Sequence, residues 1–104
     1  MARMVVMYRK PANPAEFQKH YFEVHVPLAK QLDGLRKYEV SMGSIATISG
    51  SFEPFLVATL TFDSLEAIKA AFATDLGRRC ATDRRILAPN DNDVQMFLIN
   101  DQEV

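Results

Sequence analysis

Apolar and polar positions along the chain follow two different periods, and these periods predict a first strand and a first helix. Residues 3–9 are rich in apolar and β-branched side chains and lead into a run of Pro, Ala and Asn, which predicts a strand and then a turn. Asn13 with Glu16 three residues later is typical of a helix N-terminus. One apolar helix face follows at spacings of three and four residues, formed by Phe17, Tyr21, Val24, Leu28 and Leu32. Pro27 lies within this pattern and should kink the helix or split off its last turn.

The rest of the chain predicts four further elements. They are strands over 35–47, 55–62 and 93–100 and one helical region before the last strand. The helical region opens with a second capping pattern at 63–66, breaks near 75–77 and ends by Pro89. The resulting order, βαββαβ, is that of a ferredoxin-like α+β fold, in which a four-stranded antiparallel sheet carries its helices on one face. At 104 residues the chain fits a single domain over residues 1–104.

The predicted strands are apolar on both faces. A sheet covered by helices on one side should be polar on the other. Instead, each of three strands has apolar residues on both faces. In the first strand Met4, Val6 and Tyr8 alternate with Val5 and Met7, and in the third strand Leu56, Leu60 and Phe62 alternate with Phe55 and Val57. In the last strand Phe97 and Ile99 alternate with Val94, Met96 and Leu98. No further helix is available to cover a second face, so we predict a homodimer, a dimeric α/β barrel, in which two sheets pack face to face. The alternative is a second face that is merely less polar than usual.

Composition and charge narrow the class of protein. The chain is 48% hydrophobic with a net charge of −1, which argues against a nucleic-acid partner or a charged membrane surface. Its single cysteine excludes a disulfide framework and any cysteine-rich metal site, and the two histidines lack a second ligand at metal spacing. The apolar start of the chain is too short for a signal peptide, and no stretch reaches the length of a membrane span. We therefore expect a cytoplasmic protein without a metal ion.

Both histidines lie on the predicted first helix and are the first candidates for chemistry. At about 100° per residue, His20 falls about 85° from the centre of the apolar face, which predicts a position at the solvent edge. His25 falls about 55° from that centre, which directs it toward the boundary between helix and sheet. Pro27 removes a backbone donor and crowds the carbonyl of Glu23, so the helix should open near His25. The alternative is a core-edge histidine bonded to a backbone carbonyl.

Asp83 is the second candidate. If residues 76–87 form a helix, Asp83 lies on the apolar stripe together with Cys80, within about 60° of the other stripe positions. A buried carboxylate needs a partner or a proton. The possible partners are His25, Arg79, Arg84 and a backbone amide.

Four arginines flank Asp83 in the sequence. They are Arg78, Arg79, Arg84 and Arg85, and they predict a solvated helix face, with an anion-binding rim as the alternative. Cys80 is expected to be a small core residue rather than a nucleophile, because nothing nearby in the sequence would lower its pKa.

A distinctive run of residues extends from the first predicted helix into the second strand. It comprises Phe17, Tyr21, His25, Pro27 and Leu28, followed by Gly34, Leu35 and Tyr38. Together with residues 62–64 and the segment around Asp83, this run resembles the signature of the EthD-like family, which belongs to the dimeric α/β barrel superfamily of ferredoxin-like domains. The resemblance covers nearly the whole chain.

This resemblance implies a homodimer with face-to-face sheets and a pocket in each subunit between helices and sheet, with His25 at its edge. Relatives include proteins associated with ethyl tert-butyl ether degradation beside an oxygenase system, a methylmuconolactone isomerase, and polyketide cyclases or decarboxylases. They handle small, often aromatic or cyclic molecules, generally without a metal or organic cofactor. The expected function is therefore a cofactor-independent isomerase, cyclase or oxygenase-type enzyme of small-molecule catabolism or secondary metabolism.

Each candidate residue then has an expected role. His25 would be the general acid/base, and Asp83 would orient it, polarise it or hold a proton itself. Tyr21 and Tyr38, and less directly Tyr8, would donate hydroxyl hydrogen bonds to a developing oxyanion. The alternative is a non-catalytic protein that binds a small hydrophobic ligand or assists an oxygenase system. Haem binding through a histidine, as in other barrel relatives, is a third hypothesis.

Overall fold

The computed structural model describes residues 1–104 and is built around a four-stranded antiparallel sheet. The strands are β1 (Ala2–Arg9), β2 (Lys37–Val40), β3 (Pro54–Phe62) and β4 (Val94–Asn100). Their order across the sheet is β2-β3-β1-β4, which places β1 and β3 at the centre. With the helices between them, the strands form the ferredoxin-like βαββαβ arrangement, and the predicted α+β fold class is confirmed.

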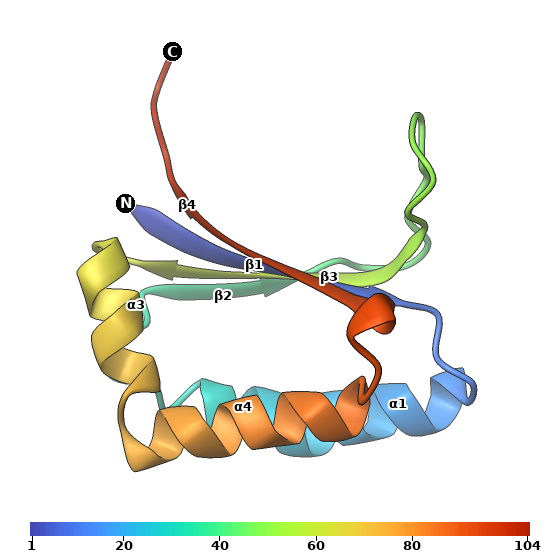
Figure 1. Cartoon of the computed structure of the whole chain (residues 1–104), viewed down its shortest axis with the longest axis horizontal. Helices are drawn as coiled ribbons and strands as arrows, with labels where there is room; N and C mark the ends of the chain where they lie inside the picture. Colours follow the sequence, from blue (N-terminus) through green and yellow to red (C-terminus); the bar gives the residue numbers. More distant parts are fainter.

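The helices lie on one side of this sheet (Figure 1). They are α1 (Pro14–His20), the π-helical segment η1 (Tyr21–His25), α2 (Val26–Ala29), α3 (Leu65–Phe72) and α4 (Asp75–Leu87), and a short 3₁₀ turn, η2 (Asp91–Asp93), precedes β4. The helix α4 packs against η1 and α2, whereas α3 stands at one end of the sheet (Figure 1). None of the helices combines the length and the apolar character needed to cross a membrane.

The helices begin at capping side chains. Asn13 Oδ1 accepts a hydrogen bond from the backbone N–H of Glu16 at 3.1 Å, as the capping pattern predicts, and Ser64 caps α3 in the same way. Thr74 caps α4 by accepting a hydrogen bond from the N–H of Gly77 at 3.0 Å. These local bonds satisfy backbone donors that a helix leaves unpaired at its start, and they account for where the three helices begin.

Pro27 distorts the first helix, as predicted, without ending it. The helix widens into η1, where the N–H of Val26 donates to the carbonyl of Tyr21, five residues back. Because proline has no N–H and its ring crowds the carbonyl four residues earlier, a wider turn accommodates it while the chain remains helical. A π-helical turn also places residues five apart on nearly the same side of the helix.

The second strand is much shorter than the predicted span of 35–47. Of the predicted span, only Lys37–Val40 (β2) pairs with β3. Residues 41–53 leave the sheet as a loop that rises on the side opposite the helices (Figure 1). The pairing ends at Ser41, whose N–H donates to the carbonyl of Val57 at 2.8 Å and whose Oγ accepts from the N–H of Val57 at 3.0 Å. Gly43 then adopts a φ of +73°, which belongs to the left-handed region and not to a strand.

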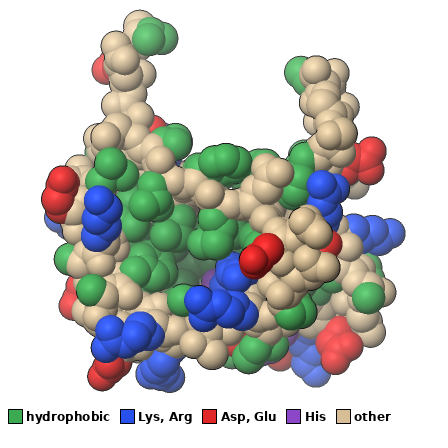
Figure 2. Space-filling model, viewed as in Figure 1, with side chains coloured by type: hydrophobic (Ala, Val, Ile, Leu, Met, Phe, Trp, Pro, Cys, Tyr) green, Lys and Arg blue, Asp and Glu red, His purple; other side chains and the backbone are tan.

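The hydrophobic core fills the space between the sheet and the helices, where apolar side chains gather (Figure 2). Its largest fully buried side chains are Tyr8, Tyr21, Phe62 and Ile68. The ring of Tyr8 meets Phe17 edge-on at 5.2 Å and Tyr21 at 5.9 Å between centroids. This aromatic cluster anchors α1 and η1 on β1.

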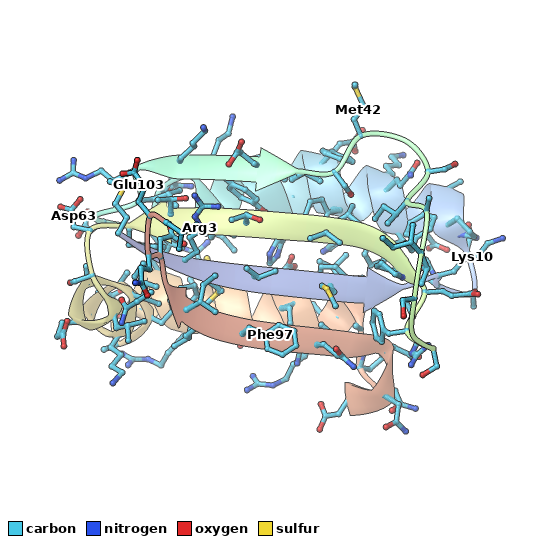
Figure 3. The ribbon with its side chains drawn as sticks, turned by 90° about the horizontal axis from the view of Figure 1, so that it is seen from above. Arg3, Lys10, Met42, Asp63, Phe97 and Glu103 are labelled. Atoms are coloured by element: carbon cyan, nitrogen blue, oxygen red, sulfur yellow. The ribbon has the colours of Figure 1, made fainter.

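The opposite face of the sheet, which we call the outer face, has no helix over it (Figure 3). Because Val6 and Tyr8 are buried under the helices, the alternate residues of β1 point to the outer face. By strand register, its apolar side chains are Val5, Met7, Val57, Phe97 and Ile99. Toward β2 the outer face becomes polar, with Thr59 and Thr61 opposite Glu39 and Lys37.

Phe55 departs from the predicted alternation. The register of β1 and β3 shifts between Tyr8 and Arg9, so that these residues pair with Leu56 and Pro54 and leave Phe55 without a partner. Its ring contacts Phe17 of the core at 5.8 Å between centroids. The outer face is therefore apolar through β1, β4 and Val57, and not through Phe55.

Candidate functional site

An apolar cavity of about 190 Å³ lies between the sheet and the helices, and we call it the central pocket. All four strands and the segments η1, α2, α3 and α4 contribute to its wall, and 12 of its 15 lining residues are hydrophobic. The polar groups on the wall belong to Tyr8, Tyr21, His25, Tyr38, Arg84 and Arg85. In Figure 2 a hollow with apolar walls opens beside Lys or Arg side chains, and a histidine is visible deep inside it. Such an apolar pocket with a few convergent polar groups suits a small organic ligand.

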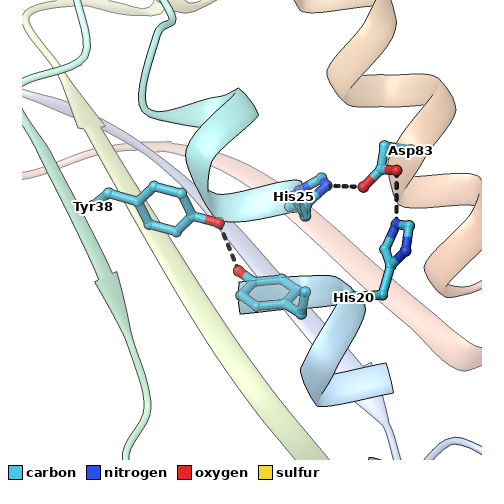
Figure 4. A network of polar contacts seen from close by, with 5 residues as sticks. His20, His25, Tyr38 and Asp83 are labelled. Carbon is cyan, nitrogen blue, oxygen red and sulfur yellow. Dashed lines mark hydrogen bonds and ion pairs between the residues drawn. The ribbon is translucent and has the colours of Figure 1, made fainter. Parts of the chain in front are cut away.

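His25 and Asp83 lie in hydrogen-bond contact although 58 residues separate them in sequence. His25 Nδ1 is 2.8 Å from Asp83 Oδ2 (Figure 4). Both side chains are nearly buried, with exposed fractions of 11% and 10%. Of the partners considered for Asp83, His25 makes the contact, and no arginine bonds to the carboxylate.

A second imidazole contacts the other oxygen of the same carboxylate. His20 Nε2 is 2.8 Å from Asp83 Oδ1, and the His20 side chain remains 31% exposed (Figure 4). The helical wheel predicted a position at the solvent edge for His20 and gave no sign of this contact. On a regular α-helix, positions five apart are rotated by about 140°, so His20 and His25 fall on opposite flanks. The π-helical segment removes most of that rotation, and Pro27 was the signal in the sequence that the regular wheel would fail here.

The three predicted tyrosines meet at the central pocket. Tyr21 Oη and Tyr38 Oη are 2.7 Å apart and hydrogen-bonded (Figure 4). The hydroxyl of Tyr8 makes no bond within the chain and is not fully buried, and the Tyr8 side chain lines the pocket. Burial raises the pKa of Tyr38 to about 12 and also raises the pKa of Tyr21 and of Tyr8. All three are therefore neutral hydroxyls near neutral pH.

The electrostatics of His25 suit proton exchange with a ligand. Burial lowers the pKa of His25 below its ordinary value, and the bond to Asp83 opposes that shift. Because a carboxylate only accepts, Nδ1 carries the hydrogen, and in the neutral ring the lone pair resides on Nε2. Nε2 makes no hydrogen bond within the chain and is not fully buried, and the His25 side chain lines the central pocket. This nitrogen can accept a proton from a bound molecule and return it.

The arginine cluster of α4 divides between two environments. Arg84 and Arg85 line the central pocket, whereas Arg78 bonds to Asp75 at 2.7 Å at the start of the helix. Cys80 also lines the pocket, but burial raises the pKa of its thiol, so it lacks the thiolate that a nucleophile requires. No three His, Cys, Asp or Glu side chains are grouped so that they would hold a metal ion.

The chain is similar in sequence to a known domain family and to a bacterial protein. The family model of the EthD domain matches residues 9–88. A protein of Rhodococcus erythropolis, an uncharacterized 11.0 kDa protein in the thcB-thcC intergenic region, is 32% identical over 84 residues, which cover 80% of each chain.

Solved structures match over nearly the full length. An ethyl tert-butyl ether d (ethd) family protein of Bacillus halodurans has a TM-score of 0.85 at 24% identity, with coverage of 98% of this chain and 99% of that chain. A dimeric ferredoxin-like protein of unknown function from Jannaschia sp. has a TM-score of 0.69 at 15% identity, covering 95% and 97%. SnoaB, a cofactor-independent oxygenase of Streptomyces nogalater, has a TM-score of 0.68 at 16% identity, covering 99% and 94%. At these identities the structural similarity supports the fold alone.

Proposed function

The chain belongs to the EthD domain family, and from that membership we propose that it is a cofactor-independent enzyme that moves a proton on a small apolar, oxygenated compound. The ligand occupies the central pocket. His25 is the general acid/base, and Asp83 is the positioning residue that orients its ring. The reaction class is isomerisation, cyclisation or oxygenation of a carbon acid, within catabolism or secondary metabolism.

One observation carries this proposal. A buried histidine is bonded through Nδ1 to a carboxylate at 2.8 Å and lines an apolar pocket with its other nitrogen free. A histidine tied to a backbone carbonyl in a closed core would have favoured a structural role instead. The nearby tyrosine hydroxyls add donors to the same pocket, since the rings of Tyr21 and His25 lie 5.3 Å apart between centroids.

For an isomerisation the chemistry balances with these groups alone, whereas an oxygenation would also consume dioxygen as the oxidant. Nε2 of His25 takes a proton from an acidic C–H or O–H of the ligand and becomes an imidazolium, whose Nδ1–H bond to Asp83 then joins opposite charges. The electron pair left on the ligand moves onto a ligand oxygen. Tyr8 and one hydroxyl of the Tyr21–Tyr38 pair can donate to that oxygen, because one of the two hydrogens in the pair is used between the tyrosines. Return of the proton to a different atom completes an isomerisation.

The proposal is tested by finding a ligand and then following its protons. A thermal-shift screen of lactones, phenols and quinones identifies compounds that bind the native state and raise its melting temperature. Proton NMR in D₂O then measures how fast the bound compound exchanges its acidic C–H for deuterium. His25→Asn should slow the catalysed exchange by about a hundredfold or more, because general acid–base catalysis contributes factors of that size.

Lys19→Asn is the matched control for this experiment. It introduces the same residue on the exposed side of α1 and should leave the exchange rate unchanged. Exchange by a folded His25→Asn variant at the wild-type rate would remove His25 from the mechanism. Tight binding with no exchange in the wild type would favour a ligand-binding or accessory protein for an oxygenase system. The bond between the Tyr21 and Tyr38 hydroxyls is the observation that supports this alternative, because it engages one donor that a catalytic pocket would keep free.

We further propose that the chain forms a homodimer through the outer face. Phe97 and Ile99 on that face are 46% and 42% exposed, and β4 is an edge strand whose outer hydrogen-bonding side has no partner strand. The similar Jannaschia protein is described as dimeric. Figure 3 shows the outer face from above, with the ring of Phe97 lying over β4.

Light scattering coupled to size-exclusion chromatography tests the dimer. The wild type should elute with the mass of two chains, and Phe97→Asp should shift it toward one. Ile86→Asp is the matched control, because Ile86 is also an exposed apolar side chain, at 63%, but lies on the helical side of the molecule. A monomeric wild type, or equal effects of the two substitutions, would contradict the proposed interface.

A further inference from the structure

The wall of the central pocket carries positive charge and no carboxylate. Arg84 and Arg85 are among its 15 lining residues, and none of the others is Asp or Glu. Asp83, which bonds to His25 from behind, lines a groove on the outer surface of the helices instead. In Figure 2 Lys or Arg side chains lie directly beside the mouth of the hollow. The pocket is therefore apolar inside and cationic at its rim.

Neither of the two guanidinium groups is neutralised within the chain. Arg84 Nη1 donates to the carbonyl of Ala88 at 3.1 Å and meets no acid, and Arg85 makes neither a hydrogen bond nor an ion pair. Three of the five other arginines are paired with carboxylates at 2.7 to 2.8 Å, namely Arg3 with Asp101, Arg36 with Asp63 and Arg78 with Asp75, whereas Arg9 donates to the carbonyl of Asn92 and Arg79 makes no ion pair. The two arginines at the pocket thus keep their donors available for an incoming anion.

The charge of Arg84 reaches the residues inside the pocket. Burial is the main cause of the lowered pKa of His25, and the charge of Arg84 adds to that effect. Burial raises the pKa of Tyr8, and Arg84 opposes the shift. Because Arg84, His25 and Tyr8 line the same cavity of about 190 Å³, an anionic group held by Arg84 would sit within the length of a small molecule from the proposed base and from a free hydroxyl.

The size of the pocket limits the body of that molecule. An apolar protein cavity of about 150 Å³ accommodates benzene, so a cavity of about 190 Å³ fits one ring with small substituents. We propose that the ligand of the central pocket is a monocyclic apolar compound bearing a carboxylate, with its ring inside the pocket and its carboxylate on Arg84 and Arg85 at the rim. The planar fork of guanidinium donors matches the two oxygens of a carboxylate. This inference rests on the proposed function of the pocket and adds the chemical class of its ligand.

Isothermal titration with matched probes tests the ligand class. The probes are 4-methylbenzoate, the neutral and nearly isosteric 4-methylbenzamide, and 4-methylphenyl phosphate. The wild type should bind the benzoate about tenfold or more tightly than the amide, because a charge-assisted hydrogen bond exceeds a neutral one by roughly a factor of ten in affinity, and added salt should reduce the difference. Arg84→Gln and Arg85→Gln should each remove much of this preference without weakening binding of the amide.

Two further variants make the result specific. Arg84→Lys keeps the charge but loses the guanidinium fork, so its preference for the benzoate should fall between wild type and Arg84→Gln. Arg78→Gln removes an equal charge from the same helix outside the pocket and should change nothing, and thermal melts confirm that each variant is folded.

Equal affinity for benzoate and amide, an unchanged preference in the two arginine variants, tighter binding of the phosphate, or no binding of any probe at millimolar concentration would overturn the inference. His25→Asn separates this inference from the proposed catalysis. If the variant binds the benzoate like wild type while the wild type exchanges no ligand proton, the catalytic role fails and the ligand class stands. If exchange occurs on neutral compounds with no preference for acids, the ligand class fails alone.

Discussion

The carboxylate of Asp83 joins two histidines, and its replacement by an amide is the sharpest test of the site. In Asp83→Asn only one oxygen remains to accept, so one of the two imidazole N–H groups at 2.8 Å loses its acceptor and the other bonds to a neutral group. A hydrogen bond to a charged group contributes about 1.5–3 kcal/mol, and the contact to His25 is nearly free of solvent screening because both side chains are about one-tenth exposed. The contact to His20 counts for less, since that ring is 31% exposed. We expect the variant to lose about 2 kcal/mol of unfolding free energy.

Urea denaturation near neutral pH measures this loss, and thermal melts should show a midpoint lower by roughly 10 °C for a domain of this size. Because a dimer melts at a temperature that depends on its concentration, wild type and variant must be compared at one protein concentration. Asp63→Asn is the matched control. It makes the same change in an exposed pair with Arg36, whose side chains are 56% and 58% exposed, and should have a much smaller effect.

Nitrogen-15 NMR of the imidazole rings gives a second readout that a general loss of stability would not produce. With Asp83 present, the neutral ring of His25 should carry its hydrogen on Nδ1. With asparagine, the side-chain amide can donate to Nδ1, and the hydrogen then moves to Nε2. A variant as stable as wild type, with the same tautomer, would refute this reasoning and mean that relief from burying the carboxylate outweighs both bonds.

Three further predictions concern single groups. Burial lowers the pKa of His25 below its ordinary value of 6.5, so the unfolded chain binds that proton more readily than the folded chain. The free energy of unfolding should therefore hold above pH 6.5 and fall as the pH drops below it. Urea midpoints measured from about pH 8 to about pH 5 should show this fall, and His25→Gln should flatten it. Gly77→Ala should cost about 1–3 kcal/mol in thermal denaturation, because the added Cβ would clash with the carbonyl oxygen of Ala71 and the Cα of Phe72, and these backbone atoms cannot move aside easily. Tyr38→Phe should lower the free energy of unfolding by about 1 kcal/mol, seen as a lower urea midpoint, because the 2.7 Å bond to Tyr21 is lost. An unchanged midpoint would mean that a bond to solvent replaces it.

Local patterns predicted those features of the molecule that depend on neighbours in sequence. Asn13 and Glu16 place the start of the first helix because their capping bond spans three residues. The helical wheel put His25 on the flank of one apolar face and Asp83 on an apolar stripe because a regular helix repeats by rotation. In the structure Asn13 caps the first helix, and both His25 and Asp83 are buried.

The predictions that failed depend on how segments meet. The second strand ends at Val40, far short of Thr47, because residues 41–53 leave the sheet and no longer run beside β3. Phe55 turns into the core because a register shift against β1 leaves it unpaired, and register is a property of two strands together. The contact of His20 was missed because its partner lies 63 residues away and because the π-helical turn that follows His20 brings His25 round to nearly the same side of the helix.

The amino-acid sequence by itself determined the order of elements, the α+β class, the helix starts and the inward positions of His25 and Asp83, because alternation, helical spacing and capping act over a few residues. Only the tertiary structure decided that one carboxylate bridges two imidazoles, that three tyrosines share a pocket, and that two of four neighbouring arginines face it. These relations join residues from α1, η1, α4 and the strands, and the distances between these elements are set by the packing of helices on the sheet. Local periodicity carries no information about such distances, and for this chain the chemistry depends on them.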